Sequence, residues 1–72
     1  MTMERAEAIR ELRAKCDELS RQITAMHPIV PKLGDTPTQN EIIRALFELT
    51  KNVEVVKKQL LRLEKKDDSA LL

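Results

Sequence analysis

Apolar residues in the first third of the chain recur at alternating intervals of three and four. This spacing puts one apolar stripe along an α-helix and is typical of a helix that packs against another helix. The positions between them carry mostly charged and polar side chains. The pattern predicts an amphipathic helix over residues 3–26. Its apolar stripe consists of Ile9, Leu12, Cys16, Leu19, Ile23 and Met26.

A second stripe with the same heptad spacing occupies the other half of the chain. Thr36 is the expected N-cap residue, Pro37 suits the first helical position, and Gln39 would complete a capping box. Thr38 with Glu41 offers a second capping box two residues later. We therefore predict a helix over residues 37–66, followed by a flexible tail over 67–72. The expected core positions are Ile42, Leu46, Leu49, Val53, Val56, Leu60 and Leu63.

Residues 27–36 contain two prolines and the only glycine, so neither helix can continue through them. A connection of this length lets two helices lie antiparallel. The predicted fold is all-α, a single domain formed by an antiparallel, coiled-coil-like two-helix hairpin. Ile29, Val30 and Leu33 are expected to close the end of the helical pair.

The second helix has more apolar residues than one neighbouring helix can cover. Ile43 and Phe47 lie beside its stripe, and Leu61 returns to nearly the same side two heptads later. A contiguous exposed apolar surface usually marks an interaction site. We expect a homo-oligomer or a complex with another protein to complete a helical bundle, with Ile43, Phe47, Val53 and Leu61 as contact residues. Replacing Phe47 with Asp should then abolish association.

Composition narrows the classes of function. Charged residues make up 35% of the 72 residues, yet the formal net charge is only +1. Generic nucleic-acid clamps are strongly basic, and a membrane span needs about 18 consecutive apolar residues. We therefore expect neither a membrane span nor general nucleic-acid binding. A single cysteine and the lack of an apolar leader favour the cytosol, with the nucleus as the alternative.

The chain offers little chemistry for catalysis or metal binding. Cys16 and His27 are its only cysteine and histidine, and together they cannot supply the four ligands of a structural zinc site. We expect no catalytic residues, metal or cofactor. The predicted function is a non-enzymatic protein–protein interaction module, such as a small adaptor, chaperone or inhibitor, that docks through its second helix.

A different function remains open. Arg44, Lys51 and Lys58 recur every seven residues and would form a line of positive charge on the outer face of the second helix. Such a line could contact phosphates in a small dimeric nucleic-acid-binding regulator. Steeply salt-dependent binding to DNA or RNA would distinguish this alternative.

Overall fold

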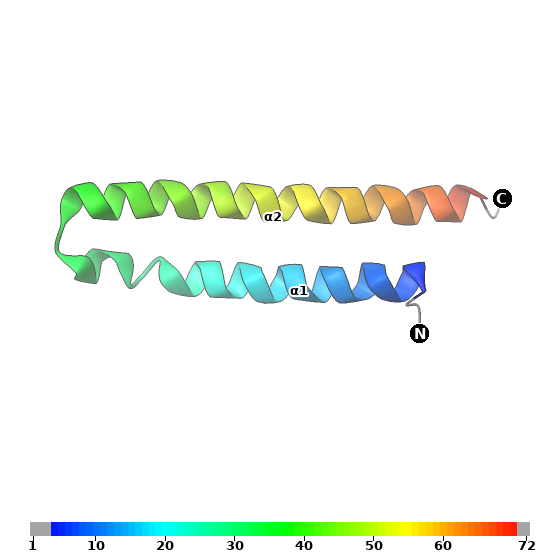
Figure 1. Cartoon of the computed structure of the whole chain (residues 1–72), viewed down its shortest axis with the longest axis horizontal. Coiled ribbons are helices and arrows are strands. Elements are labelled where there is room, and N and C mark those ends of the chain that lie inside the picture. Colours follow the sequence, from blue (N-terminus) through cyan, green and yellow to red (C-terminus); the bar gives the residue numbers. More distant parts are fainter. Residues whose placement is uncertain (1–3, 71–72) are drawn as a thin grey trace.

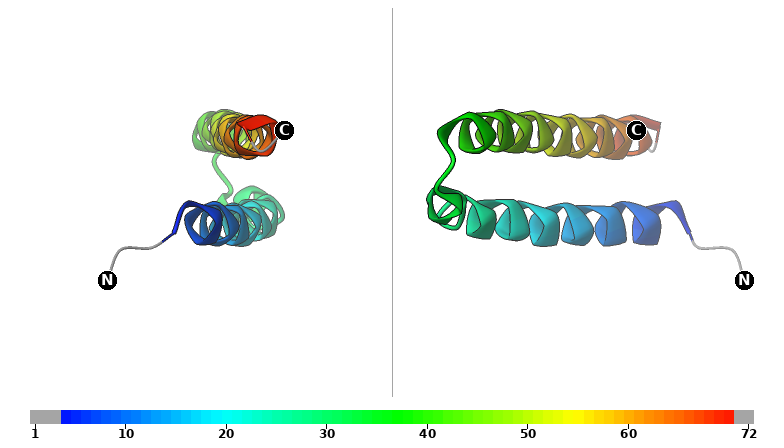
Figure 2. Two further views of the ribbon diagram at one scale, coloured as in Figure 1. Left: turned by 90° about the vertical axis from the view of Figure 1, so that its right-hand side faces the viewer. Right: turned by 60° about the vertical axis from the view of Figure 1, so that its left-hand side comes forward.

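The computed structural model describes residues 4–70, with the side chains of residues 4–67, as an antiparallel helical hairpin. Helix α1 spans Arg5–Met26, the short 3₁₀-helix η1 spans Val30–Leu33, and helix α2 spans Thr36–Ala70. The two long helices lie side by side and run in opposite directions (Figure 1), as the two rotated views in Figure 2 also show. The predicted all-α hairpin is confirmed.

Helix α2 is longer than the sequence indicates. It continues through Ala70, so residues 67–70 are helical where a flexible tail was expected. Arg5 of α1 donates a hydrogen bond of 2.7 Å to the carboxylate of Asp67 and so ties this end of α2 to α1. The predicted start of the first helix at residue 3 and the last two residues of the predicted tail lie outside the described residues.

Asp35, one residue earlier than predicted, caps the start of α2. The backbone N–H of Thr38 donates to Oδ2 of Asp35 at 3.2 Å, and the Thr38 hydroxyl donates to the same oxygen. These two hydrogen bonds, the one from the hydroxyl more than the one from the N–H, hold the pKa of the Asp35 carboxyl below its ordinary value. Thr36 is therefore the first helical residue, because the carboxylate before it satisfies an otherwise unpaired donor.

The connection turns the chain through a glycine in the left-handed region. Gly34 has a φ of 67°, and its N–H donates to the carbonyl oxygen of Pro31 at 3.4 Å. A side chain at this φ would cost backbone energy, which explains why glycine fits here. Val30 is buried as expected, whereas Ile29 and Leu33 are exposed and do not close the hairpin.

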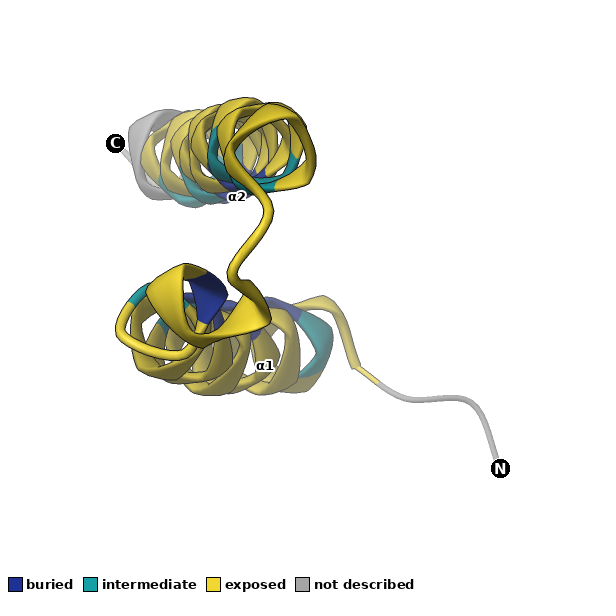
Figure 3. Ribbon diagram, turned by 90° about the vertical axis from the view of Figure 1, so that its left-hand side faces the viewer, coloured by how far each residue is buried: buried dark blue, intermediate teal, exposed yellow. Residues whose placement is uncertain are grey.

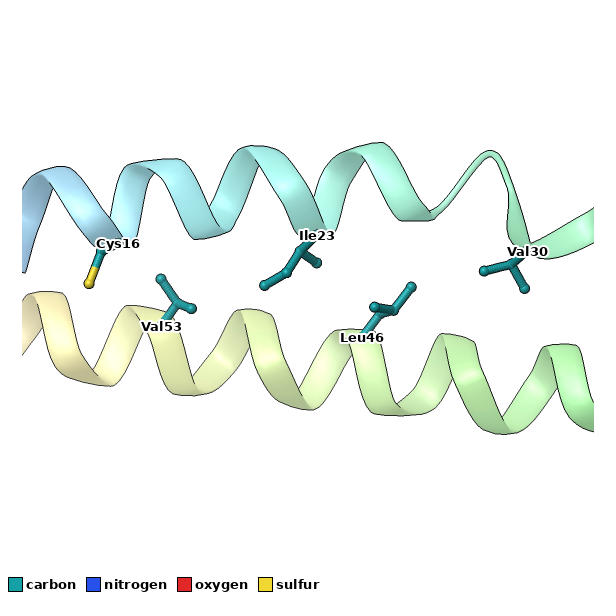
Figure 4. Close-up of a cluster of buried hydrophobic side chains, with 5 residues drawn as sticks. All are labelled: Cys16, Ile23, Val30, Leu46 and Val53. Carbon is teal, nitrogen blue, oxygen red and sulfur yellow. The ribbon is translucent and has the colours of Figure 1, made fainter.

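The core is one row of side chains between the helices. In the end-on view of Figure 3, the buried positions lie where α1 and η1 face α2. Side chains from the two sides interdigitate along the axis (Figure 4). The buried residues recur every seven positions in each half of the chain. They are Ile9, Cys16, Ile23 and Val30 on one side and Leu46, Val53 and Leu60 on the other.

Five of the thirteen predicted stripe residues are exposed instead. Each heptad of the two stripes has two apolar positions, but only one of them faces the neighbouring helix. A helix pair alone has one line of contact, so the second position of each heptad stays at its edge. This corrects the prediction that both positions pack within the hairpin. The exposed stripe residues are Leu12, Leu19, Met26, Leu49 and Val56.

Candidate protein-interaction surface

Besides the Arg5–Asp67 pair near the ends of the helices, two ion pairs between α1 and α2 define one side of the hairpin. Nη1 of Arg13 lies 3.0 Å from Oε2 of Glu64, and Nζ of Lys57 lies 3.2 Å from Oδ1 of Asp17. Both pairs bridge α1 and α2 on the same side of the buried row. We call the side that carries these four residues the charged flank.

The exposed stripe residues lie on the opposite side. Successive helical residues are rotated by about 100°, so Leu12 and Arg13 fall on opposite sides of buried Ile9. In α2, Val56 and Lys57 are likewise on opposite sides of buried Val53. Since the charged flanks of the two helices coincide, their apolar flanks coincide as well.

This shared apolar side is called the open face. Helix α1 contributes three of its residues and α2 contributes four, so neither helix forms it alone. The residues that form it are Leu12, Leu19, Met26, Ile42, Leu49, Val56 and Leu63. Ile42 and Leu63, at the two ends of the α2 row, are half-buried, and Ile42 also packs against the core, while the other five are 41–48% exposed.

The open face is large for so small a chain. Its α2 row runs from Ile42 to Leu63, which is about 30 Å at about 1.5 Å per residue. A helix pair is roughly 20 Å wide, so the face covers on the order of 600 Å². The largest apolar patch of a typical monomer reaches roughly 300–600 Å² and is often functional. The apolar part of the open face therefore falls within that range.

The edges of the open face carry little charge. In each heptad, the residue that directly precedes the buried-row position in the sequence lies at this edge. Five of these seven edge residues are uncharged. Charge depletion is the compositional mark of the buried centre of protein interfaces. The two charged exceptions are lysines. The edge residues are Ala8, Lys15, Gln22, Ala45, Asn52, Gln59 and Lys66.

The structure does not bring the four predicted contact residues together. Val53 is buried against α1 and cannot meet a partner, which corrects that assignment. Ile43 was expected to be exposed, but it is half-buried and packs against the core. Phe47 and Leu61 are exposed as predicted, but they are separated by about 20 Å along the helix.

Phe47 and Leu61 belong to the charged flank and not to the open face. The ring of Phe47 meets that of His27 edge to face, with centroids 5.9 Å apart, and 65% of Phe47 remains exposed. Leu61 lines a shallow cleft with Arg13 and Lys57. Charged groups thus line the cleft at Leu61 and Phe47 contacts the ring of His27, whereas the open face is continuous.

Sequence reasoning missed the open face because it assigned every stripe residue to the hairpin core. One feature of the sequence could have indicated it. Both heptad positions are apolar in both helices, which is the pattern of a helix with more than one neighbouring helix. A hairpin in isolation needs only one apolar position per heptad.

The three predicted phosphate contacts lie along α2 and are exposed. The guanidinium of Arg44 is 3.9 Å from the carboxylate of Glu41, which partly offsets its charge. Lys58 lines the cleft that also contains Glu54, and Lys51 lies between Arg44 and Lys58 in the line. Nucleic-acid binding by Arg44, Lys51 and Lys58 stays a prediction.

Within residues 4–70 the structure has neither a metal-binding cluster nor a membrane-spanning helix. No group of three His, Cys, Asp or Glu side chains there could hold a metal ion. The only cysteine, Cys16, is buried in the central row. Neither long helix has, within residues 4–70, a stretch apolar enough to cross a bilayer.

Comparisons with known proteins give no relative from which to infer a function. No family model matches the chain, and no curated protein or solved structure matches it significantly.

Proposed function

We propose that this chain is a non-enzymatic protein–protein interaction module that packs its open face against helices of another polypeptide. The observation that carries the proposal is the exposure of Leu12, Leu19, Met26, Leu49 and Val56 on one side of the hairpin. Adaptor, chaperone and inhibitor roles all use such packing. In contrast to the sequence-based expectation, the proposed surface comes from both helices and not from α2 alone.

The driving force would be the burial of aliphatic area. Covering the apolar part of the open face, roughly 400 Å² of its total area, contributes on the order of 10 kcal/mol. Association costs about 4–15 kcal/mol in lost freedom of motion, so the gain and the cost are comparable. Binding should therefore require most of the open face to be covered at once. A partner that touches only one end of the hairpin would not bind stably.

In-cell photo-crosslinking tests this proposal and captures the partner in the same experiment. A photoreactive amino acid replaces Leu49 on the open face or, as a matched control, Val55. The two residues belong to the same helix and are 44% and 49% exposed, but Val55 points away from α1. Each variant is expressed in the source cell, irradiated, and examined for covalent adducts on a denaturing gel.

We expect a discrete adduct from position 49 and little from position 55. Mass spectrometry of the adduct then shows whether the crosslinked polypeptide is this chain or a different protein, and either result supports the proposed function. Equal adduct yields at the two positions, or no adduct at position 49, would contradict it.

A further inference from the structure

We infer that the polypeptide covering the open face is a second copy of this chain, and that the two hairpins form a four-helix bundle. This inference rests on the proposed function, since it identifies the partner of the same surface. Three features of the hairpin support it: the spacing of the open face, its area, and the placement of charge around it.

The spacing of the side chains along the open face suits packing against the same face of a second copy. Along the hairpin axis, residues from α1 and α2 alternate, with Leu19 of α1 falling between Leu49 and Val56 of α2. The steps are about half a heptad, or roughly 5 Å. A second copy has the same steps by construction, so with the copies antiparallel each of its side-chain layers can meet one of these layers at the same level throughout. Both heptad positions would then be buried in all four helices, as a bundle core requires.

The area of the face is sufficient for a stable dimer. Each copy would contribute on the order of 600 Å², or about 1,200 Å² in total, which reaches the lower end of the range for specific interfaces. Dimer formation would also relieve a weakness of the single hairpin. Its buried row contains seven apolar residues, a small core for a chain of 8.3 kDa.

The charges favour one relative orientation of the copies. Lys15 and Lys66 adjoin the open face towards the end away from η1. Asp35 precedes Ile42 by one heptad and so continues the α2 row at the η1 end, where it is anionic. Two copies with their η1 ends at opposite ends of the bundle bring Lys66 of one copy towards Asp35 of the other. The reverse orientation would gather the lysines of both copies at one end.

Asn52 lies at the centre of this arrangement. It adjoins the open face midway between Ile42 and Leu63, so the twofold axis of the dimer passes close to it. The two Asn52 side chains would lie near each other and could exchange amide hydrogen bonds. Lys51, one residue earlier, points away from the open face and provides a matched control position.

Light scattering and crosslinking of the purified full chain test the inference. For wild type at micromolar concentrations we expect twice the chain mass of 8.3 kDa. Leu49→Asp should reduce the mass to that of one chain, whereas Val55→Asp should leave it doubled. Because Leu49→Asp can also unfold a chain that depends on its partner, a second measurement uses variants that keep the face intact. In a Cys16→Ala background, Asn52→Cys should be linked into dimers by a short bismaleimide and Lys51→Cys should not.

Specific outcomes would overturn the inference. A mass of one chain at every concentration would exclude the second copy. The proposed function would survive that result if position 49 still crosslinks to a different protein in cells. A doubled mass without linkage through Asn52→Cys, or a doubled mass that persists in Leu49→Asp, would show that the copies meet through another surface.

Discussion

At the scale of single residues, the hairpin depends on how completely each row position is buried. Ile23 is 2% exposed, whereas Ile29 is 58% exposed in the connection. We expect Ile23→Ala to lower the free energy of unfolding by about 2–4 kcal/mol, because it leaves a cavity between the helices. Ile29→Ala, the same change at the surface, should cost less than about 0.5 kcal/mol. Urea denaturation followed by circular dichroism measures both, and equal losses would contradict the assigned core.

Asp35 gives a pH-dependent prediction at the same scale. Hydrogen bonds from Thr38 lower the pKa of the Asp35 carboxyl, so the folded state favours the carboxylate. Its contribution to stability is present above the ordinary Asp pKa and is lost as the pH falls through the lowered value. The Tm difference between wild type and Asp35→Ala should therefore be larger at pH 7 than near pH 2.

A conservative variant separates the charge of Asp35 from its capping oxygen. Asp35→Asn keeps an acceptor for the Thr38 N–H but cannot ionise, so we expect a smaller loss of Tm at pH 7 than in Asp35→Ala. Thermal unfolding of wild type and both variants at pH 7 and near pH 2 measures these Tm differences. A wild-type advantage over Asp35→Ala that does not change with pH would mean that the carboxylate charge plays no part in the cap.

At the scale of the elements, ion pairs align the two helices but contribute little stability. The side chains of Arg13 and Glu64 are each about half exposed. A double-mutant cycle with Arg13→Ala and Glu64→Ala should give a coupling energy of about 0.2–1 kcal/mol that decreases in 1 M salt. Denaturant unfolding measures it. A coupling energy well above 1 kcal/mol that does not change with salt concentration would show that the pair contributes more stability than its exposure suggests.

The turn between the helices has its own requirement. Gly34 has a φ of 67°, and no heavy atom lies within 4 Å of where a Cβ would be. Gly34→Ala should therefore destabilise through backbone strain alone, by about 1 kcal/mol, and Gly34→Asn by less. Thermal unfolding of the two variants tests the order. A fully neutral Gly34→Ala would contradict the left-handed conformation.

Local patterns predicted the elements well, because helix formation and helix termination are encoded by nearby residues. The heptad spacing indicated both helices, and the segment around Pro28, Pro31 and Gly34 indicated the connection. The end of α2 was not predictable in this way, since Asp67 is held by Arg5, 62 positions away. The N-cap was misplaced by one residue because Asp35 and Thr36 are both good capping residues.

The open face was only partly predictable, for a geometric reason. The excess of apolar residues correctly indicated an exposed apolar surface, but heptad spacing alone does not tell how many helices surround a stripe. The assignment of Leu19 and Leu49 to the core, and the choice of Phe47 as a contact residue, followed from assuming that the hairpin buries both heptad positions. The ion pairs Arg13–Glu64 and Lys57–Asp17, which fix one flank, show which side stays open.

At the scale of the whole molecule, the hairpin is a thin rod with little interior. Its dimensions of 56 × 23 × 16 Å leave room for one row of buried side chains. The remaining aliphatic stripe residues must therefore lie on the surface, and both helices place them on the same side. This shape is why we infer that the chain works as part of a larger helical assembly.

The most direct test of this account compares one residue from the open face of α1 with the most exposed apolar residue of the charged flank. A photoreactive amino acid is placed at Leu19 or at Phe47, and the yield of covalent adduct is measured after irradiation of living cells. We predict a high yield at position 19 and a low yield at position 47, even though Phe47 is the more exposed residue. A high yield at position 47 with none at position 19 would contradict the central claim.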